Sequence, residues 1–326
     1  MVMATCLIPS QRAPNRRTPV LGAPVIYKDS LIASMEGRHN SQIKSPLFSV
    51  IPSEIRNAIF ILALTTYDDL SAPYPTPNVH YNRPGYRCEH RIDTSLLPTC
   101  RRIYTETHDL PIRLNEHVLW FKKGRGPPGV RYCDDPMACF YAMTNEQRQA
   151  VETIHLFTEL SWLEGTFPMV FEALPNLLGF RPKNLKITVR HGDWWFWGYM
   201  SPPLLFRKGW TESLSRIHGL KTLEVELESV EKDKFQLEMI EDEMRSWRID
   251  AGNGNVFSIE DTTQIPPYSY VGPDLFGDML YDHDRGVWGP LQAIPRTNLS
   301  KKLNYTVYTT RWKSIQSEDL GRFGSR

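Results

Sequence analysis

The residues best suited to chemistry lie in one short stretch that directly follows an alternating segment ending at position 190. They are Arg190, His191, Asp193, Trp194, Trp195 and Trp197. Aromatic rings beside charged groups can form a stacking pocket for a base, a planar ligand or a peptide side chain. The alternative is that the rings fold back and cap the edge of the core. The stretch is therefore a candidate pocket for a small ligand.

Signatures of catalysis and of metal binding are missing from the sequence. The His191 and Asp193 pairing is too common to indicate acid–base catalysis, and no serine or cysteine nucleophile motif accompanies it. The strings typical of phosphate loops, dinucleotide-binding turns, zinc proteases and α/β-hydrolases do not occur. Cys88 and His90 are too close in sequence for a structural zinc site. We therefore expect no catalytic residue, no metal and no cofactor.

The elements that must position the stretch form a repeating pattern. Segments 152–157, 185–190 and 222–228 alternate in polarity, and helical stretches near 166–175, 203–218 and 232–247 separate or follow them. This order at this spacing indicates parallel crossovers. Strands covered on both sides should be continuously apolar, so we expect one face of the sheet to be open. The prediction is an α/β fold with a small leucine-rich-repeat-like, mostly parallel sheet and helices on one face, although the period exceeds the usual 20–29 residues.

The expected open face carries charges of both signs. Lys186 and Arg190 on one strand would lie beside Glu224, Glu226 and Glu228 on the next. Exposed pairs of this kind contribute about 0–1 kcal/mol each. The face is either solvated and self-complementary or a polar surface that binds a partner.

A helix is predicted from Pro52, with Glu54 in the first turn where the helix dipole favours an acid. Its apolar residues follow the helical period and are Ile55, Ala58, Ile59, Leu62 and Ala63. Further apolar residues widen this stripe, namely Phe60, Ile61 and Leu64. The helix is therefore either buried on two sides or has one side that awaits a partner.

Two segments carry a family resemblance. They are Pro52-Ser53-Glu54-Ile55-Arg56-Asn57-Ala58-Ile59-Phe60 and Thr99-Cys100-Arg101-Arg102-Ile103-Tyr104-Thr105-Glu106-Thr107. Together they resemble the paired signature of an F-box-like family of filamentous fungi, and the similarity covers roughly residues 46–250. A true F-box docks on the small adaptor of cullin-type ubiquitin ligases and often precedes leucine-rich repeats.

The resemblance implies a partner-binding helix that uses Pro52, Glu54, Ile55, Phe60, Ile61 and Leu64. The proline-rich insertion at 67–95 departs from the F-box pattern and puts adaptor docking in question. The alternative is that the resemblance reflects only the way in which a pair of helices packs against the sheet.

Composition and charge limit the remaining classes of function and of cellular location. Among 326 residues, 38 Lys and Arg balance 37 Asp and Glu, so the net charge of the chain does not favour binding to nucleic acid. Apolar runs end before the roughly 18 residues that a membrane span needs. Five cysteines without a secretory signal favour reduced thiols in the cytoplasm or nucleus.

The expected organisation is a disordered tail at 1–45, a single α/β domain at 46–316 and a second tail at 317–326. Within the domain, 46–121 is the F-box-like helical part with a long loop at 67–95, and 130–250 is the repeat-like part. Residues 251–316 are irregular and include a terminal strand at 303–312. The function expected is a non-enzymatic protein-interaction module, in its specific form a substrate receptor of a ubiquitin ligase. The alternative is a small-ligand binder or enzyme with a pocket at 190–200.

Overall fold

The fold is described from a computed structural model. It covers residues 42–74, 83–121, 126–127, 138–141, 143–168, 180–194, 203–259, 265–273, 279–282, 287–290 and 302–317. The tails expected at 1–45 and 317–326 lie outside these residues, except for 42–45 and 317.

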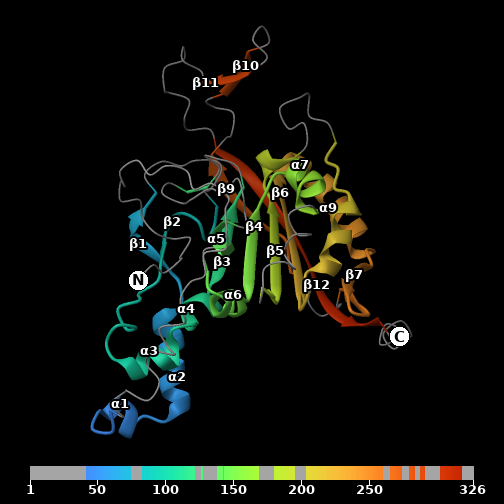
Figure 1. Ribbon diagram of the computed structural model, residues 1–326. Helices are drawn as coiled ribbons and strands as arrows, with labels where there is room; N and C mark the ends of the chain where they lie inside the picture. The colour runs from blue at the N-terminus through green and yellow to red at the C-terminus, as the bar shows by residue number, and fades with distance from the viewer. Residues whose placement is uncertain are drawn as a thin grey trace, which may run out of the picture.

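An eight-stranded mixed sheet forms the centre of the molecule (Figure 1). Its parallel strands, in spatial order, are β3 (Glu116–Trp120), β4 (Thr153–Phe157), β5 (Asn184–Val189) and β6 (Thr222–Val230). The expected terminal strand is β12 (Lys302–Gln316), which lies antiparallel beside β6. The antiparallel part continues with β8 (Asn255–Ser258) and β9 (Tyr268–Pro273) on β12 and with β7 (Ile249–Gly252) on β8. The predicted α/β class and parallel strands are confirmed.

Helical segments cover one face of this sheet and enclose the main core. The apolar positions of the alternating strands, such as Leu185, Ile187 and Val189, are fully buried there. The covering elements are α5 (Ala138–Tyr141), α7 (Leu160–Gly165), the 3-10 segment η3 (Lys208–Arg216) and α9 (Lys234–Arg245), while α6 (Asn145–Ala150) lies at the amino-terminal end of β4. Thr144 and Gln147 form a capping box that begins α6. The period-2 pattern of the strands therefore identifies the face that meets the helices.

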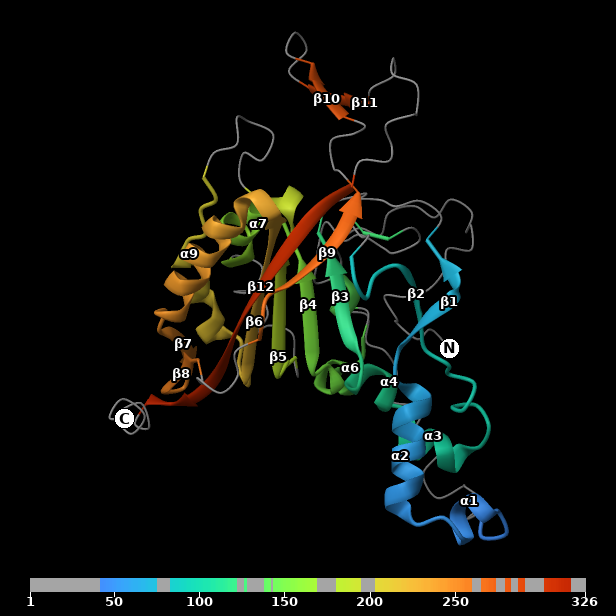
Figure 2. The same ribbon diagram turned by 180° about the vertical axis from the view of Figure 1, so that it is seen from behind.

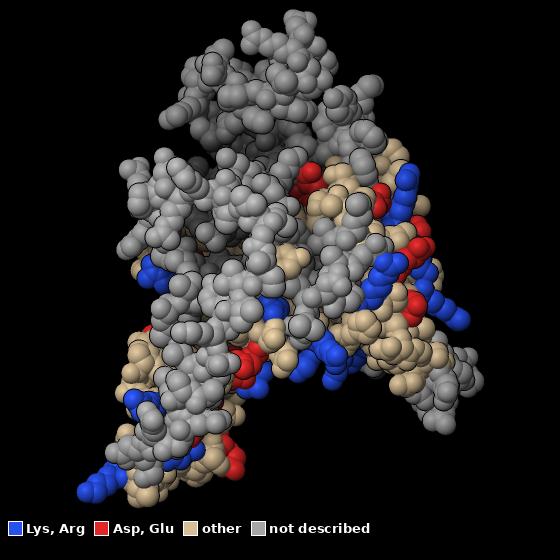
Figure 3. Space-filling model, in the orientation of Figure 1, with Lys and Arg blue, Asp and Glu red and all other residues tan. Residues whose placement is uncertain are grey.

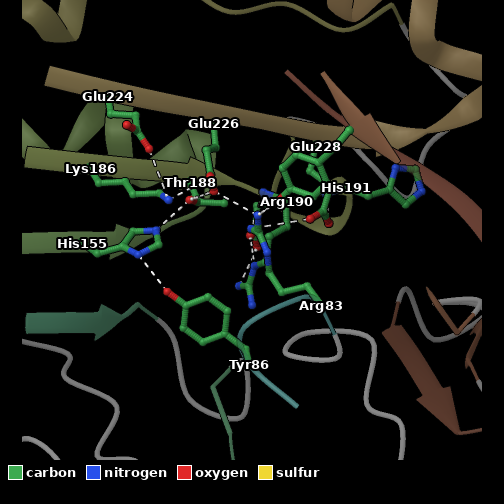
Figure 4. A network of polar contacts seen from close by, with 12 residues as sticks. Arg83, Tyr86, His155, Lys186, Thr188, Arg190, His191, Glu224, Glu226 and Glu228 are labelled. Atoms are coloured by element: carbon green, nitrogen blue, oxygen red, sulfur yellow. Dashed lines mark hydrogen bonds and ion pairs between the residues drawn. The ribbon is translucent and has the colours of Figure 1, made fainter. Parts of the chain in front are cut away.

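The opposite face of the sheet is partly covered, which corrects the expectation of an open face. In the segment expected to be a loop, β1 (Tyr67–Pro73) and β2 (Cys88–Arg91) pair as an antiparallel ribbon separate from the large sheet. The chain at 83–91, called the strap below, places Arg83 and Tyr86 against the polar side of β4–β6 (Figure 4). Glu226 and Glu228 are consequently only 6% and 3% exposed.

The N-terminal helices form a second, smaller core beside the amino-terminal ends of the parallel strands (Figures 1 and 2). They are α1 (Pro46–Ser49), α2 (Ser53–Leu64), α3 (Arg101–Thr107) and α4 (Leu110–Arg113). Their shared core contains Phe60, Leu64, Leu97, Ile103 and Leu110. This arrangement holds α2 away from the segments that follow the carboxyl ends of β4 and β5.

Smaller elements complete the described chain. They are the 3-10 turns η2 (His191–Asp193) and η4 (Glu231–Asp233) and the hairpin of β10 (Met279–Asp282) and β11 (Val287–Pro290). None of the helices in the described ranges has the length and apolar character needed to cross a bilayer.

Candidate functional site

One face of α2 is an apolar surface exposed to solvent. Ile55, Ile59 and Leu62 are 56%, 41% and 79% exposed. Their spacing of four and three residues places them on a single side of the helix. Val50, just before α2, is also exposed. These four residues are called the α2 stripe below, and their exposure on a helix makes them a candidate interaction surface.

The other side of α2 fixes the helix firmly to its neighbours. Phe60 and Leu64 are 2% and 0% exposed and pack in the small core. The Asn115 side chain donates to the carbonyl of Leu64 at 2.9 Å and accepts from the backbone amide of Thr66 at 2.6 Å. Asn115 thereby satisfies backbone groups at the end of the helix that would otherwise lack partners. The helix that carries the α2 stripe is thus held in place by the small core and by Asn115.

These burial values revise the expected partner-binding residues. Phe60 and Leu64 are buried and cannot contact a partner while the small core is intact. Ile61 is half-buried, whereas Pro52, Glu54 and Ile55 are exposed. Sequence reasoning missed Ile59 and Leu62 as surface residues. Their helical spacing indicated that they share one side of the helix, but spacing alone does not tell which of two apolar sides packs in the core.

A second candidate region is a buried polar cluster between the strap and the sheet (Figure 4). On the sheet side, the Thr188 hydroxyl donates to Glu226 at 2.8 Å and lies 2.7 Å from His155 Nε2. Lys186 Nζ lies 2.8 Å from Glu226 and 3.2 Å from Glu224. The polar residues of three neighbouring strands are therefore joined in one network.

Two side chains of the strap complete this network. Arg83 Nη2 donates to Glu226 Oε2 and to the Tyr268 hydroxyl, each at 2.9 Å, and Arg83 Nη1 lies 3.5 Å from Glu228 Oε2. The Tyr86 hydroxyl is 2.9 Å from His155 Nδ1. Neutral His155 with its proton on Nε2 satisfies both contacts, because it donates to Thr188 and accepts from Tyr86.

The network perturbs the pKa of its members in opposite directions. Burial alone would raise the pKa of Glu226, but the charges of Arg83 and Lys186 outweigh it and lower that pKa to about 2. Burial lowers the pKa of His155, which the neighbouring Glu116 carboxylate only partly offsets. Glu226 is therefore held ionised and His155 is favoured in its neutral form.

The described members of the candidate pocket come together at the carboxyl end of β5, but all of them are buried. Arg190 Nε lies 2.6 Å from Asp193 Oδ2, and His191 Nδ1 is 3.0 Å from the Ser229 hydroxyl. The Trp194 indole donates to the carbonyl of Glu228 at 2.9 Å. These contacts are the ones expected if the stretch caps the core. Trp195 and Trp197 lie outside the described residues.

Among the described residues, metal ligands offer no further site. No group of three or more His, Cys, Asp or Glu residues in those ranges is arranged to hold a metal ion. Acidic and basic side chains are interspersed over the α9 side of the molecule, with no separation by sign there (Figure 3).

Comparison with known proteins supplies no family for this arrangement: no family model, curated protein or solved structure matches the chain.

Proposed function

We propose that the chain is a non-enzymatic protein-interaction module of the cytoplasm or nucleus and that the α2 stripe is its docking surface. The specific form is an F-box-like substrate receptor that docks on the adaptor of a cullin-type ubiquitin ligase. The observation that carries the proposal is the exposure of Ile55, Ile59 and Leu62 on one side of a helix whose other side is buried.

The free energy available from the α2 stripe indicates how large the contact with a partner must be. Burying a large aliphatic side chain that was fully exposed contributes about 1.5–3 kcal/mol. The three partly exposed residues of α2 would then supply roughly 2–5 kcal/mol. Association itself costs on the order of 4–15 kcal/mol, so the α2 stripe must be the centre of a larger contact. A helix that lays an apolar side into a groove is a common form of such contacts.

The position of α2 is suited to a receptor. The helix lies beside the amino-terminal ends of the parallel strands, while η2 follows the carboxyl end of β5 at the other end of the sheet (Figures 1 and 2). A partner on α2 would therefore leave the opposite end and the strap accessible to a second protein.

The test compares surface variants of the full chain for binding to the purified adaptor. The docking variant is Ile59→Asp with Leu62→Asp, and the control is Leu70→Asp, because Leu70 is 80% exposed on β1 and not on α2. Circular dichroism checks that each variant folds.

We expect the wild type and the Leu70 variant to bind the adaptor and the α2 variant to bind at least tenfold more weakly. Absence of adaptor binding by the wild type would refute the receptor assignment. Equal binding by the α2 variant would refute the assigned surface.

A further inference from the structure

We propose that Glu226, Glu228, Phe157 and Tyr268 form a socket for a guanidinium group, which Arg83 of the strap occupies and which an arginine of a partner peptide can take over. These four residues are called the guanidinium socket below. The inference rests on the proposed function, which it deepens by naming the class of protein segment that the module recognises.

The chemistry of the socket matches an arginine side chain. The guanidinium of Arg83 contacts Glu226 and the Tyr268 hydroxyl at 2.9 Å, and its central carbon lies 5.4 Å from the centre of the Phe157 ring. Carboxylates that accept planar N–H donors, together with an aromatic face, favour arginine over lysine. Figure 4 shows Arg83 reaching toward Glu226 and Glu228 from the strap, which lies opposite the strands that carry these two residues.

The fit of Arg83 in the socket is incomplete. Arg83 Nε and Nη1 and Glu228 Oε2 are buried and have no hydrogen-bond partner among the described residues. Arg83 Nη1 and Glu228 Oε2 are 3.5 Å apart, so the second carboxylate is near the cation but not hydrogen-bonded to it. Buried polar atoms without partners are unfavourable. An arginine with a different backbone position could hydrogen-bond to both carboxylates and so compete with Arg83 for the socket, where Glu228 Oε1 also accepts from the His191 amide.

The strap is attached in a way that permits displacement. Its ribbon, β1 and β2, is not part of the eight-stranded sheet. The backbone hydrogen bond within its turn runs from the Tyr86 amide to the Arg83 carbonyl, and another from the Tyr74 amide to the Arg87 carbonyl joins the two arms of the ribbon. Among the described strap residues, the side chains of Arg83 and Tyr86 are hydrogen-bonded to groups of the sheet. These residues form no strand ladder with the large sheet, so displacing them would break none there.

The neighbouring contact of Tyr86 defines a second requirement for the partner. Its ring packs nearly perpendicular to the Trp120 and Phe157 rings at centroid distances of 5.5 and 5.0 Å, while its hydroxyl reaches His155. A competing segment should therefore form a β-turn like that of the strap, with an arginine followed three residues later by a tyrosine. A tethered strap competes at an effective concentration on the order of millimolar, so the wild type should bind such a segment weakly.

The test uses the peptide acetyl-Arg-Pro-Gly-Tyr-amide and the full chain, without adaptor. We expect the Arg83→Ala/Tyr86→Ala variant to bind the peptide at least tenfold more tightly than the wild type in calorimetry. A peptide with alanine in place of arginine should not bind, and adding Glu226→Gln to the variant should abolish binding. No binding by the folded double variant, or binding unchanged by Glu226→Gln, would overturn the proposal.

A measurement on the wild type covers the case in which the double variant does not fold. With millimolar peptide, the ring NMR signals of Tyr86 should shift, because the peptide displaces this ring from Trp120, Phe157 and His155. Unchanged Tyr86 signals would overturn the proposal. Because neither measurement involves the α2 stripe, failure of the guanidinium socket is distinguishable from failure of adaptor docking.

Discussion

Replacing each of two leucines on α2 by alanine provides a direct test of which side of the helix faces the protein. Leu64 is 0% exposed and Leu62 is 79% exposed, although they lie only two residues apart. Truncating a fully buried leucine to alanine costs about 2–5 kcal/mol, because both transfer energy and packing are lost. The same change at an exposed site alters stability by no more than about 0.5 kcal/mol. The identical chemistry makes Leu62→Ala the control for Leu64→Ala.

Native-state hydrogen exchange is the assay suited to this pair. The small core of α1–α4 is separate from the main core, so α2 amides report the opening of this part of the molecule. A loss of about 2–5 kcal/mol corresponds to exchange that is roughly 30-fold to several thousandfold faster. We expect this acceleration in Leu64→Ala and nearly unchanged exchange in Leu62→Ala. Equal acceleration in both variants would refute the assigned faces of α2 and, with them, the docking surface.

Three further predictions concern other parts of the fold. Because the pKa of Glu226 falls from 4.5 to about 2 on folding, its contribution to stability is present above about pH 4.5 and is lost as the pH falls toward 2. That loss is about 3 kcal/mol, and urea titrations at several pH values should show a smaller acid loss in Glu226→Gln. Gly254→Ala should cost about 1–2 kcal/mol because it places a side chain at positive φ, and Gly252→Ala should lower the melting temperature further. Both residues have φ of 76°, but an added Cβ lies 2.4 Å from the Ser215 carbonyl oxygen only at Gly252, and equal melting temperatures would contradict this reasoning. Thr144→Ala should reduce the free energy of unfolding by about 1 kcal/mol through loss of the capping box, and an unchanged urea midpoint would argue against that cap.

The central strands could be predicted from the sequence because their pattern is local. Alternation such as that of Leu185, Ile187 and Val189 depends on each strand alone, and it correctly identified the side that meets the helices. The partner strands of β12 could not be predicted in the same way. Its pairing with β6 joins distant parts of the chain, and the local sequence of a strand does not indicate which distant strand will lie beside it.

The candidate sites were harder to predict for two physical reasons. On α2, two apolar sides compete for the core, and the choice depends on Leu97, Ile103 and Leu110, which arrive from elsewhere in the chain. The strap has no periodic apolar residues and is held on the sheet by Arg83 and Tyr86. Isolated charged and aromatic residues in a proline-rich segment are typical of a solvated loop, so the contact of Arg83 and Tyr86 with the sheet was not foreseen.

The position of β12 in the sheet has a consequence for synthesis of the protein. The β6 edge that pairs with β12 becomes complete at Val230, but its partner begins only at Lys302. At roughly 5–20 residues per second, that edge waits on the order of 4–14 s on the ribosome before its partner is made. An unpaired edge next to an apolar core is a site of aggregation during that interval. The nascent chain should therefore depend on ribosome-associated chaperones until β12 emerges from the exit tunnel.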